Sequence, residues 1–422
     1  MIVDFTIKNF RSLKTEQLLS LHAEKKPKHH SGNIAFIEND LGVLRTCAIY
    51  GSNAAGKTNI LLAFEALVSL VVESGDLKDG DAIESYEPYL LSERTIDSPT
   101  CFEIEFYIDK VRYFYQIEYK KHEILYEKLD YYPSSKSANI FTRTSPNDWK
   151  NVKFGEHYKG GRKQVAFFAN NSYLSKAGNT ADAPEMIRKV YNYFRRSFHT
   201  AFAHQQLGVF DWEDDVRTVD IVNTFLKKID LGIEKFSIER DETYKDIKLP
   251  DDMPDDLKAK LNNEFSKIVS FYHPDEEGNL VKFSKEKESR GTERLFKMLP
   301  FFIDILRDGA VLLIDEIESS FHPHVAELIV KLFNDPIVNK KNAQLIFTTH
   351  DLILMGSDTM RKDQIYLAEK TVEHGTILHC LDNYESTLKD SSPFAKWYDE
   401  GRLGAIPKIN YKDISDALKE AF

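Results

Sequence analysis

Short apolar runs alternate with helical patterns at both ends of the chain. Near the start, Val3, Phe5 and Ile7 alternate with polar residues, which predicts a half-buried strand. The stretch 102–119 indicates two strands joined by a tight turn near Asp109. Toward the end, apolar strands in VLLIDE, QLIFTTHD and QIYLAEK alternate with helices, which is typical of an α/β protein with a mostly parallel sheet.

The middle of the chain has a different character. Residues 120–164 are irregular and lysine-rich, and the patterns over 183–206, 215–230 and 251–271 favour helices. We therefore predict an α/β body in two pieces, interrupted by a mixed, mainly helical insertion that carries dimer or partner contacts. The predicted boundaries are 1–120 for the first piece, 121–280 for the insertion and 281–422 for the second piece.

The sequence GSNAAGKTN lies between the apolar run LRTCAIY and a helical pattern. Gly51, Gly56, Lys57 and Thr58 fit the phosphate-loop pattern G-x-x-x-x-G-K-[ST], whose glycines let backbone N–H groups curl around a phosphate. Lys57 would reach the β- and γ-phosphates of ATP, and Thr58 would offer its hydroxyl to Mg²⁺. A glycine turn without a ligand is the alternative. The other loop residues that we expect to contact the nucleotide are Asn53 and Asn59.

Two carboxylates and a histidine end the later apolar strands. Asp315 and Glu316 follow VLLI, where Asp315 would hold Mg²⁺ and Glu316 would polarise the attacking water as general base. His350 ends the next apolar strand, where it can donate to the γ-phosphate or orient the water. Without a phosphate loop in the same chain, the two acids would be interpreted as solvated side chains and His350 as a polar loop residue. Together with Lys57 they predict an ATPase site in which Lys57, Glu316 and His350 are catalytic.

The stretch ESRGTERLF is a second candidate anion site. Ser289, Gly291 and Thr292 stand just before a helical pattern, where exposed N–H groups and the positive end of the helix dipole would attract phosphate. Because the chain already has a phosphate loop, this second site predicts a nucleotide held between two copies. The Ser289 loop of each copy would close over the phosphates of the other. A simple helix cap is the alternative.

Composition narrows the class of protein. The net charge of −11 argues against a protein that coats nucleic acid by bulk attraction, although a local basic patch stays open. The three cysteines have no C-x-x-C spacing, so neither a disulfide framework nor a zinc site is predicted. The N-terminus lacks the apolar stretch of a signal peptide, and no apolar run approaches a membrane span. We expect a cytoplasmic protein without membrane contact.

Taken in order, these motifs resemble the ATPase head of ABC-type proteins in the SMC and RecF-like branch. GSNAAGKT resembles the Walker A motif, ESRGT a degenerate signature, LLIDE the Walker B motif, IESSFHP the D-loop and TTHD the switch histidine. In IKNFRSL, Arg11 matches an arginine that lies near the nucleotide in that branch. The resemblance implies a P-loop NTPase fold with an ABC-type sheet, which binds ATP and Mg²⁺. It also implies a homodimer or higher oligomer with ATP sandwiched between the heads.

More closely, the chain resembles small prokaryotic AAA-labelled ATPases of antiphage and abortive-infection systems, such as the RloA-like, PARIS and Septu ATPases and the OLD proteins. Matching stretches include YLLSERTIDSPTCFEIEF, MRKDQIYLAEK and WYDEGRLGAIPKI. This resemblance implies a slow ATPase that acts as sensor or scaffold and controls an effector. Because only 13 residues follow Ile409, a nuclease domain of the OLD type does not fit, and we expect a separate effector of nuclease type.

Two other functions stay open at this stage. One is a RecF-like DNA-repair ATPase that grips duplex DNA when two heads close on ATP. Its groove would use the basic stretch 120–164 and a predicted helix that carries Arg188, Lys189, Arg195 and Arg196, although a solvated helical face is the plainer interpretation. The other is a nucleotide-locked structural partner with negligible turnover.

Overall fold

The computed structural model describes residues 1–421 with short gaps. The residues left out within this range are 24–29, 39–40, 135, 146–147, 202–211, 213–214, 242–247, 251–252, 320, 357–358, 385–387, 389–391 and 408–409.

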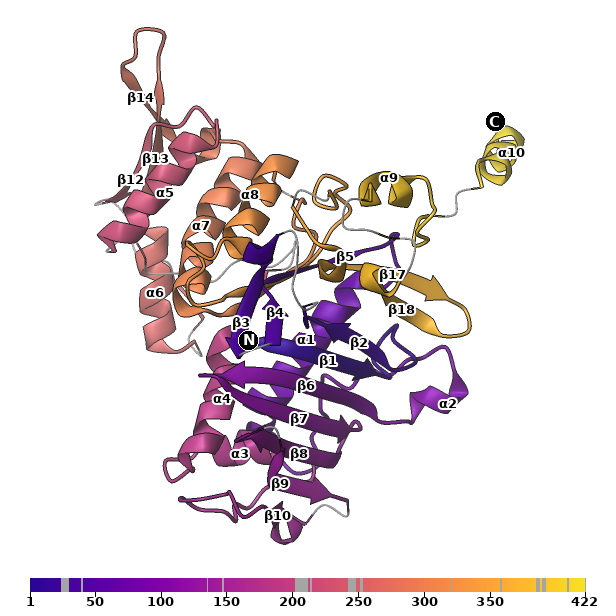
Figure 1. Ribbon diagram of the computed structural model, residues 1–422. Coiled ribbons are helices and arrows are strands. Elements are labelled where there is room, and N and C mark those ends of the chain that lie inside the picture. Colours follow the sequence, from indigo (N-terminus) through magenta and orange to yellow (C-terminus); the bar gives the residue numbers. More distant parts are fainter. Residues whose placement is uncertain are drawn as a thin grey trace.

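An antiparallel sheet of seven strands forms one half of the body (Figure 1). Its strand order is β10-β9-β8-β7-β6-β1-β2. The tight turn predicted near Asp109 joins β6 to β7, with Asp109 and Lys110 both in the left-handed region at φ 45° and 66°. The strands are β1 (Ile2–Lys8), β2 (Gln17–Ser20), β6 (Thr100–Ile108), β7 (Val111–Tyr119), β8 (Ile124–Tyr132), β9 (Ala138–Thr144) and β10 (Lys153–Phe154).

A second sheet of six strands has the predicted α/β character. Its order is β11-β15-β16-β5-β17-β18, and all neighbours are parallel except β17 and β18. All five residues of β5 are buried, because side chains on both faces of the sheet are covered. The strands are β5 (Thr46–Tyr50), β11 (Phe198–Ala201), β15 (Val311–Ile314), β16 (Gln344–Thr348), β17 (Ile365–Thr371) and β18 (Gly375–Cys380).

Helix α1 (Lys57–Val72) packs in the core between the two sheets. Cys47 and Ile49 of β5 belong to this core, and Phe64 of α1 stacks on Phe5 of β1 with ring centroids 4.0 Å apart. Ala48 and Tyr50 point to the other face, which a second core covers. Helices α3 (Tyr173–Gly178) and α4 (Glu185–Ser197) belong to the first core, whereas α5 (Val216–Lys228), α7 (Arg290–Asp308), α8 (Pro323–Asn334) and α9 (Phe394–Asp399) belong to the second.

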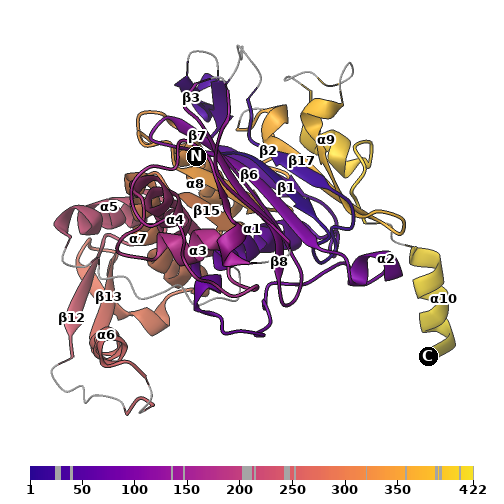
Figure 2. The same ribbon diagram turned by 90° about the horizontal axis from the view of Figure 1, so that it is seen from below.

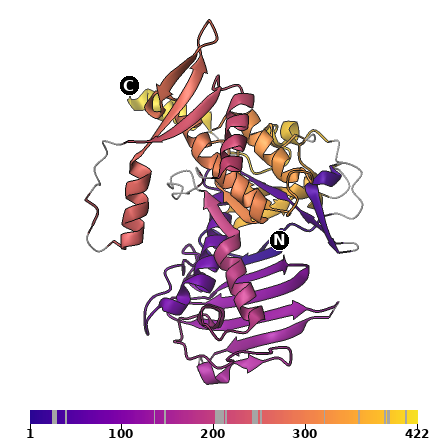
Figure 3. The same ribbon diagram turned by 90° about the vertical axis from the view of Figure 1, so that its left-hand side faces the viewer.

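Smaller elements extend from this body. Figure 3 shows α4 lying across the seven-stranded sheet and the small three-stranded sheet projecting beyond α5. The three-stranded sheet and α10 lie on opposite sides of the molecule, as Figures 1 and 2 both show. None of the described helices has an apolar stretch long enough to span a membrane. The remaining elements are β3 (Ile34–Glu38), β4 (Leu41–Leu44), β12 (Lys235–Arg240), β13 (Lys267–Pro274), β14 (Leu280–Ser284), α2 (Glu93–Ile96), α6 (Asp255–Phe265) and α10 (Tyr411–Ala421).

The insertion at 121–280 is less helical than predicted. Strands β8, β9 and β10 extend the seven-stranded sheet, and β13 pairs with β12 on one side and with β14 on the other. The helix predicted over 183–206 ends at Ser197, because the next residues form β11 and pair with β15; residues 202–206 lie outside the described part. The sequence analysis did not predict strands β8 and β9. The reason is that Glu127 and Arg143 occupy fully buried positions, which breaks the alternation of apolar and polar residues.

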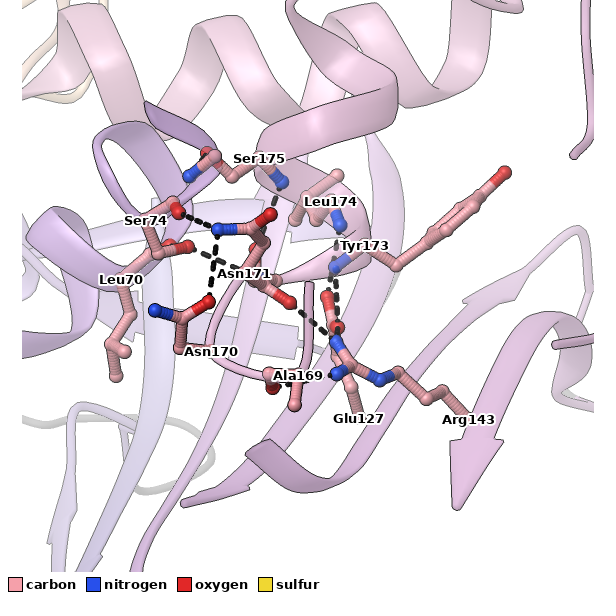
Figure 4. Close-up of polar contacts among 12 residues, drawn as sticks. Leu70, Ser74, Glu127, Arg143, Ala169, Asn170, Asn171, Tyr173, Leu174 and Ser175 are labelled. Carbon is pink, nitrogen blue, oxygen red and sulfur yellow. Dashed lines mark hydrogen bonds and ion pairs between the residues drawn. The ribbon is translucent and has the colours of Figure 1, made fainter. Parts of the chain in front are cut away.

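The buried pair of Glu127 and Arg143 holds β8 and β9 to the start of α3. The two side chains lie 3.4 Å apart and are 0% and 2% exposed. Glu127 also accepts hydrogen bonds from the backbone N–H groups of Tyr173 and Leu174 at 2.7 and 3.0 Å. Arg143 donates to the carbonyl oxygen of Ala169 at 2.9 Å (Figure 4). Both charges therefore have the additional hydrogen bonds that a buried ion pair requires.

Asn171 extends this network to the far end of α1. Its side-chain amide donates to the carbonyl oxygens of Ser74 and Leu77, in the turn that follows α1, at 2.6 and 3.1 Å. The carbonyl oxygen of Asn171 in turn accepts from Arg143 at 2.5 Å (Figure 4). The helix that begins at the phosphate-loop sequence is thus tied at its other end to the seven-stranded sheet.

Candidate nucleotide site

The phosphate-loop sequence forms the predicted turn between β5 and α1. Gly51 and Gly56 have φ values of 152° and 98°, and Ala54 between them also lies in the left-handed region at 61°. A Cβ atom on Gly56 would lie 2.2 Å from the hydroxyl of Thr376 and 2.4 Å from that of Ser12. Glycine at position 56 is therefore required both by the backbone conformation and by the close approach of two side chains.

Lys57 begins α1 and its side chain turns back into the loop. Its Nζ donates to the carbonyl oxygen of Gly51 at 3.0 Å and lies 2.8 Å from Nε2 of His350. Burial lowers the pKa of Lys57, while the nearby carboxylates of Glu316 and Asp315 oppose this change. Burial also lowers the pKa of His350, and the charge of Lys57 lowers it further. Two groups from distant parts of the sequence thus share one partly desolvated site.

Thr58 brings the first α/β piece into contact with the second. Its hydroxyl donates to the carboxylate of Asp315, with both oxygens 3.1 Å away. Thr348, at the end of β16, donates to the same carboxylate at 2.6 Å. The carboxyl ends of three adjacent parallel strands, β5, β15 and β16, therefore place these oxygen atoms in one cluster.

Glu316 follows Asp315 and has an unusual backbone conformation. Its φ of 50° lies in the left-handed region, which is strained for a residue with a side chain. The backbone N–H of Glu316 donates to the Thr348 hydroxyl at 2.8 Å, and that of Ile317 donates to the Thr348 carbonyl at 3.1 Å. These bonds hold the strained turn, and Glu316 lines the same pocket as Lys57.

The loop surrounds a pocket of about 490 Å³. A neighbouring hollow of about 500 Å³ shares Ser12, Asn59 and Lys370 with it and contains Arg11. Arg11 forms an ion pair with Glu87 at 2.7 Å and lines this neighbouring hollow but not the phosphate-loop pocket. The residues that line the phosphate-loop pocket are Ser12, Asn53, Ala54, Gly56, Lys57, Thr58, Asn59, Glu316 and Lys370.

The predicted second anion site stands apart within one chain. Ser289, Gly291 and Thr292 are not among the residues that line the phosphate-loop pocket. Ser289 caps α7, and its hydroxyl accepts from the backbone N–H of Thr292 at 3.1 Å. The helix-cap geometry is therefore present, and a role across two copies stays a prediction.

Several residues of the site were missed by the sequence analysis. Ser12 accepts from the Asn59 amide at 2.7 Å and from the Thr376 hydroxyl at 2.8 Å. Glu318 accepts from the backbone N–H of His350 at 2.5 Å. A serine or glutamate in a loop cannot be recognised as a site residue from a single sequence, because such residues are common in loops. Thr348, however, lies at the end of an apolar strand, two residues before His350. This position could have identified it as a site residue.

A family pattern matches most of the chain. It covers residues 47–356, from β5 to the segment after β16, and its description reads "AAA domain, putative AbiEii toxin, Type IV TA system". The match spans both halves of the site, the phosphate loop and the Asp315–Glu316 pair. No curated protein sequence matches the chain.

Two solved structures of SMC head domains are similar over nearly the whole chain. The SMC head domain from Thermotoga maritima is 14% identical, covers 90% of this chain and 98% of its own, and has a TM-score of 0.41. An Smc head domain with an extended coiled coil, bound to the C-terminal domain of ScpA and derived from Pyrococcus furiosus, is 11% identical. That comparison covers 95% of this chain and 99% of the other, with a TM-score of 0.40.

Proposed function

Because the chain belongs to the AAA-domain family of the AbiEii type, with an ABC-type ATPase head, we propose that it hydrolyses ATP as a subunit of a prokaryotic antiphage system. In this role it acts as a sensor or scaffold that controls a separate effector protein. The observation that carries the ATPase assignment is the contact of Thr58 with both oxygens of Asp315 at 3.1 Å, beside Lys57 and Glu316.

The residues of the phosphate loop would bind the triphosphate. Backbone N–H groups between Gly51 and Gly56 curl around the β-phosphate, and the Lys57 ammonium reaches the β- and γ-phosphates. Asn53 and Asn59 line the same pocket. The neighbouring hollow that contains Arg11 has room for the rest of the nucleotide.

Thr58 and Asp315 fit a magnesium ion. A hydroxyl and a carboxylate are hard oxygen donors, and their direct contact supports a site at which both would hold one small cation. Bound Mg²⁺ would neutralise charge on the β- and γ-phosphate oxygens. Thr348 donates to Asp315 and keeps its carboxylate oriented toward Thr58.

Glu316, which lines the phosphate-loop pocket, would act on the attacking water. As the water oxygen forms a bond to the γ-phosphorus, Glu316 accepts a proton and the bond to the β–γ bridging oxygen breaks, which gives ADP and phosphate. His350 would sense the γ-phosphate, because its ring already lies 2.8 Å from the Lys57 ammonium. Turnover is expected to be slow, since the product of such a cycle is a conformational state.

Two heads would close on shared ATP. In each copy Ser289, Gly291 and Thr292 stand at the N-terminus of a long helix, α7, whose N–H groups can bind the γ-phosphate on the partner. The antiphage role and the nuclease-type effector rest on the resemblance to defence ATPases, and the family description itself names only a putative toxin of a type IV TA system. The three free cysteines agree with action in the reducing cytoplasm.

The mass of the protein in solution with ATP and Mg²⁺ tests this proposal. We expect Glu316→Gln to form a stable dimer on ATP, because it binds but does not hydrolyse, whereas Lys57→Ala stays unpaired. Wild-type protein should release phosphate slowly, and Glu316→Gln should not. If Glu316→Gln binds ATP but its mass is unchanged, the sandwich is wrong; if it hydrolyses ATP like the wild type, Glu316 is not the base.

A DNA-gripping ATPase is the second candidate function. It is favoured by α4, where Arg188, Arg195 and Arg196 are exposed and share no described ion pair. Lys189 on the same helix is already paired with Asp109 at 2.8 Å. Duplex binding that strengthens with ATP and weakens steeply with salt would support this candidate. Co-purification of a nuclease without such binding would support the defence assignment.

A further inference from the structure

A second hollow lies at the β10 end of the seven-stranded sheet and uses none of the residues of the nucleotide site. It has a volume of about 510 Å³. We call it the Trp149 hollow. Its lining combines two half-buried aromatic residues with three exposed polar ones: Trp149, Phe154, Arg162, Lys163 and Gln164.

The surface around the Trp149 hollow is basic, although the chain as a whole is acidic. Residues 148–164 contain five Lys or Arg against two Asp or Glu, while the net charge of the chain is −11. Lysines and arginines without carboxylate partners attract polyanions. Within the described ranges, no ion pair is formed by any of Lys150, Lys153, Lys159, Arg162 and Lys163.

The aromatic rings of the hollow are held in place by the core. The Phe154 ring lies 4.8 Å from that of Tyr158 and 5.6 Å from that of Tyr173, both measured between centroids, and both tyrosines are buried. Trp149 packs on the same core, and Nζ of Lys150 lies 5.5 Å from the centroid of its ring. Rigid rings on a basic surface are the platforms on which unpaired bases stack.

The two cations that line the hollow are fixed through their main chain. The hydroxyl of Tyr173 donates to the carbonyl oxygen of Lys163 at 2.8 Å and lies 2.6 Å from the hydroxyl of Tyr158. The backbone N–H of Arg162 donates to a neighbouring loop at 3.0 Å, and its Nε donates to the Gln164 carbonyl at 3.0 Å. The guanidinium therefore keeps a defined direction and its terminal N–H groups remain available.

We propose that the Trp149 hollow binds single-stranded nucleic acid. A base stacks on Trp149 or Phe154, and Arg162 and Lys163 hold the adjacent phosphates. A duplex keeps the faces of its bases inside the stack, so a ring platform of this kind can only engage unpaired bases. The volume suits a nucleotide, because small-ligand pockets measure roughly 300–1,000 Å³. The site is independent of ATP hydrolysis.

Fluorescence anisotropy with a labelled oligo-dT of about twelve nucleotides tests the proposal, since such sites cover roughly 4–16 nucleotides. The full chain is used without ATP and with EDTA, so that a failure of the ATPase assignment cannot affect the result. We expect Trp149→Ala to weaken binding about ten-fold and Trp149→Phe to restore most of it. Quenching of tryptophan emission on binding should disappear in Trp149→Phe.

Two double variants test whether particular residues of the hollow bind the phosphates or whether nucleic acid is attracted non-specifically by surface charge. Arg162→Ala with Lys163→Ala should lower the slope of log Kd against log salt by about 0.7 for each lost phosphate contact. The matched control, Lys340→Ala with Lys341→Ala in the loop before β16, removes the same charge from exposed residues and should leave binding unchanged. Oligo-rU in place of oligo-dT shows whether RNA or DNA is preferred. Equal losses in both pairs, equal affinity for duplex DNA, or no binding at all would overturn the proposal.

Discussion

The ammonium nitrogen of Lys57 lies 2.8 Å from Nε2 of His350, although 293 residues separate the two in sequence. A lysine ammonium can only donate, so Nε2 must accept and the imidazole proton must sit on Nδ1. Burial and the charge of Lys57 lower the pKa of His350, and the carboxylates of Glu318, Glu316 and Asp315 work against this change. The ring is therefore neutral when it faces Lys57 near pH 7.

This contact predicts a pH dependence of stability in the absence of nucleotide. In the unfolded chain His350 has an ordinary pKa near 6.5, so below about pH 6.5 the unfolded state binds more protons than the folded state. Stability is thus complete above that pH and is lost as the pH falls toward the lower folded pKa. We expect the free energy of unfolding, measured in urea, to fall less steeply with acid for His350→Gln than for the wild type.

The control for this measurement is His374→Gln, which removes an exposed histidine at a β-turn. It should retain the wild-type slope. Parallel curves for all three proteins would show that the proton is taken up elsewhere.

The contact between Thr58 and Asp315 predicts how nucleotide binding depends on Mg²⁺. Thr58→Ala removes a hydroxyl that contacts a carboxylate, and loss of one such polar group is worth about 1–3 kcal/mol. We expect Mg·ATP to bind roughly ten-fold or more weakly to Thr58→Ala, while ATP in EDTA binds both proteins alike. Equilibrium dialysis measures both affinities. Thr58→Ser keeps the hydroxyl and should behave as the wild type; equal losses with and without Mg²⁺ would contradict the assignment.

Gly56 allows backbone strain and steric clash to be measured separately. Gly56→Ala places a methyl group 2.2 Å from the Thr376 hydroxyl at a φ of 98°, and we expect it to lower the free energy of unfolding and to abolish ATP binding. Gly80→Ala is the matched control, because Gly80 has a φ of 81° but nothing within 4 Å of its added Cβ.

A positive φ alone should lower the free energy of unfolding by about 1–3 kcal/mol. Gly80→Ala measures this loss, and the loss for Gly56→Ala should be larger. Thermal unfolding of both variants gives the difference. Adding Thr376→Ala to Gly56→Ala should recover part of the loss. If the two single variants lose the same stability, the close approach of Thr376 and Ser12 is unimportant.

The buried pair of Glu127 and Arg143 predicts a large loss of stability when it is broken. Arg143→Ala leaves the Glu127 carboxylate fully buried without its partner, which typically costs about 3–5 kcal/mol. Replacing both with apolar residues, Glu127→Leu with Arg143→Met, should cost less, because no unpaired charge remains. Denaturant unfolding measures each loss.

The matched control is the pair of Arg112 and Glu105, which joins adjacent strands of the same sheet at 2.5 Å but is partly exposed. Arg112→Ala should cost about 1 kcal/mol or less. A loss for Arg143→Ala that is no larger than this would mean that the network in Figure 4 adds nothing to the fold.

Features that depend only on neighbouring residues could be predicted from the sequence alone. The strand before Gly51, the glycines of the turn and the apolar run before Asp315 are local patterns, and the structure contains each of them. The turn at Asp109 is predictable for the same reason, because it depends on the conformation of two adjacent residues. The glycine turn, the turn at Asp109 and the apolar run before Asp315 all lie within residues 47–356, which the family pattern matches.

Which distant residues meet depends on how the strands are ordered in the folded chain. The order β15-β16-β5 brings Asp315, Thr348 and Lys57 to one edge, and no local pattern encodes that order. Strands β8 and β9 escaped the sequence analysis because Glu127 and Arg143 look like surface residues in the sequence. They are buried because each neutralises the other across the sheet, and that compensation exists only once the strands have paired.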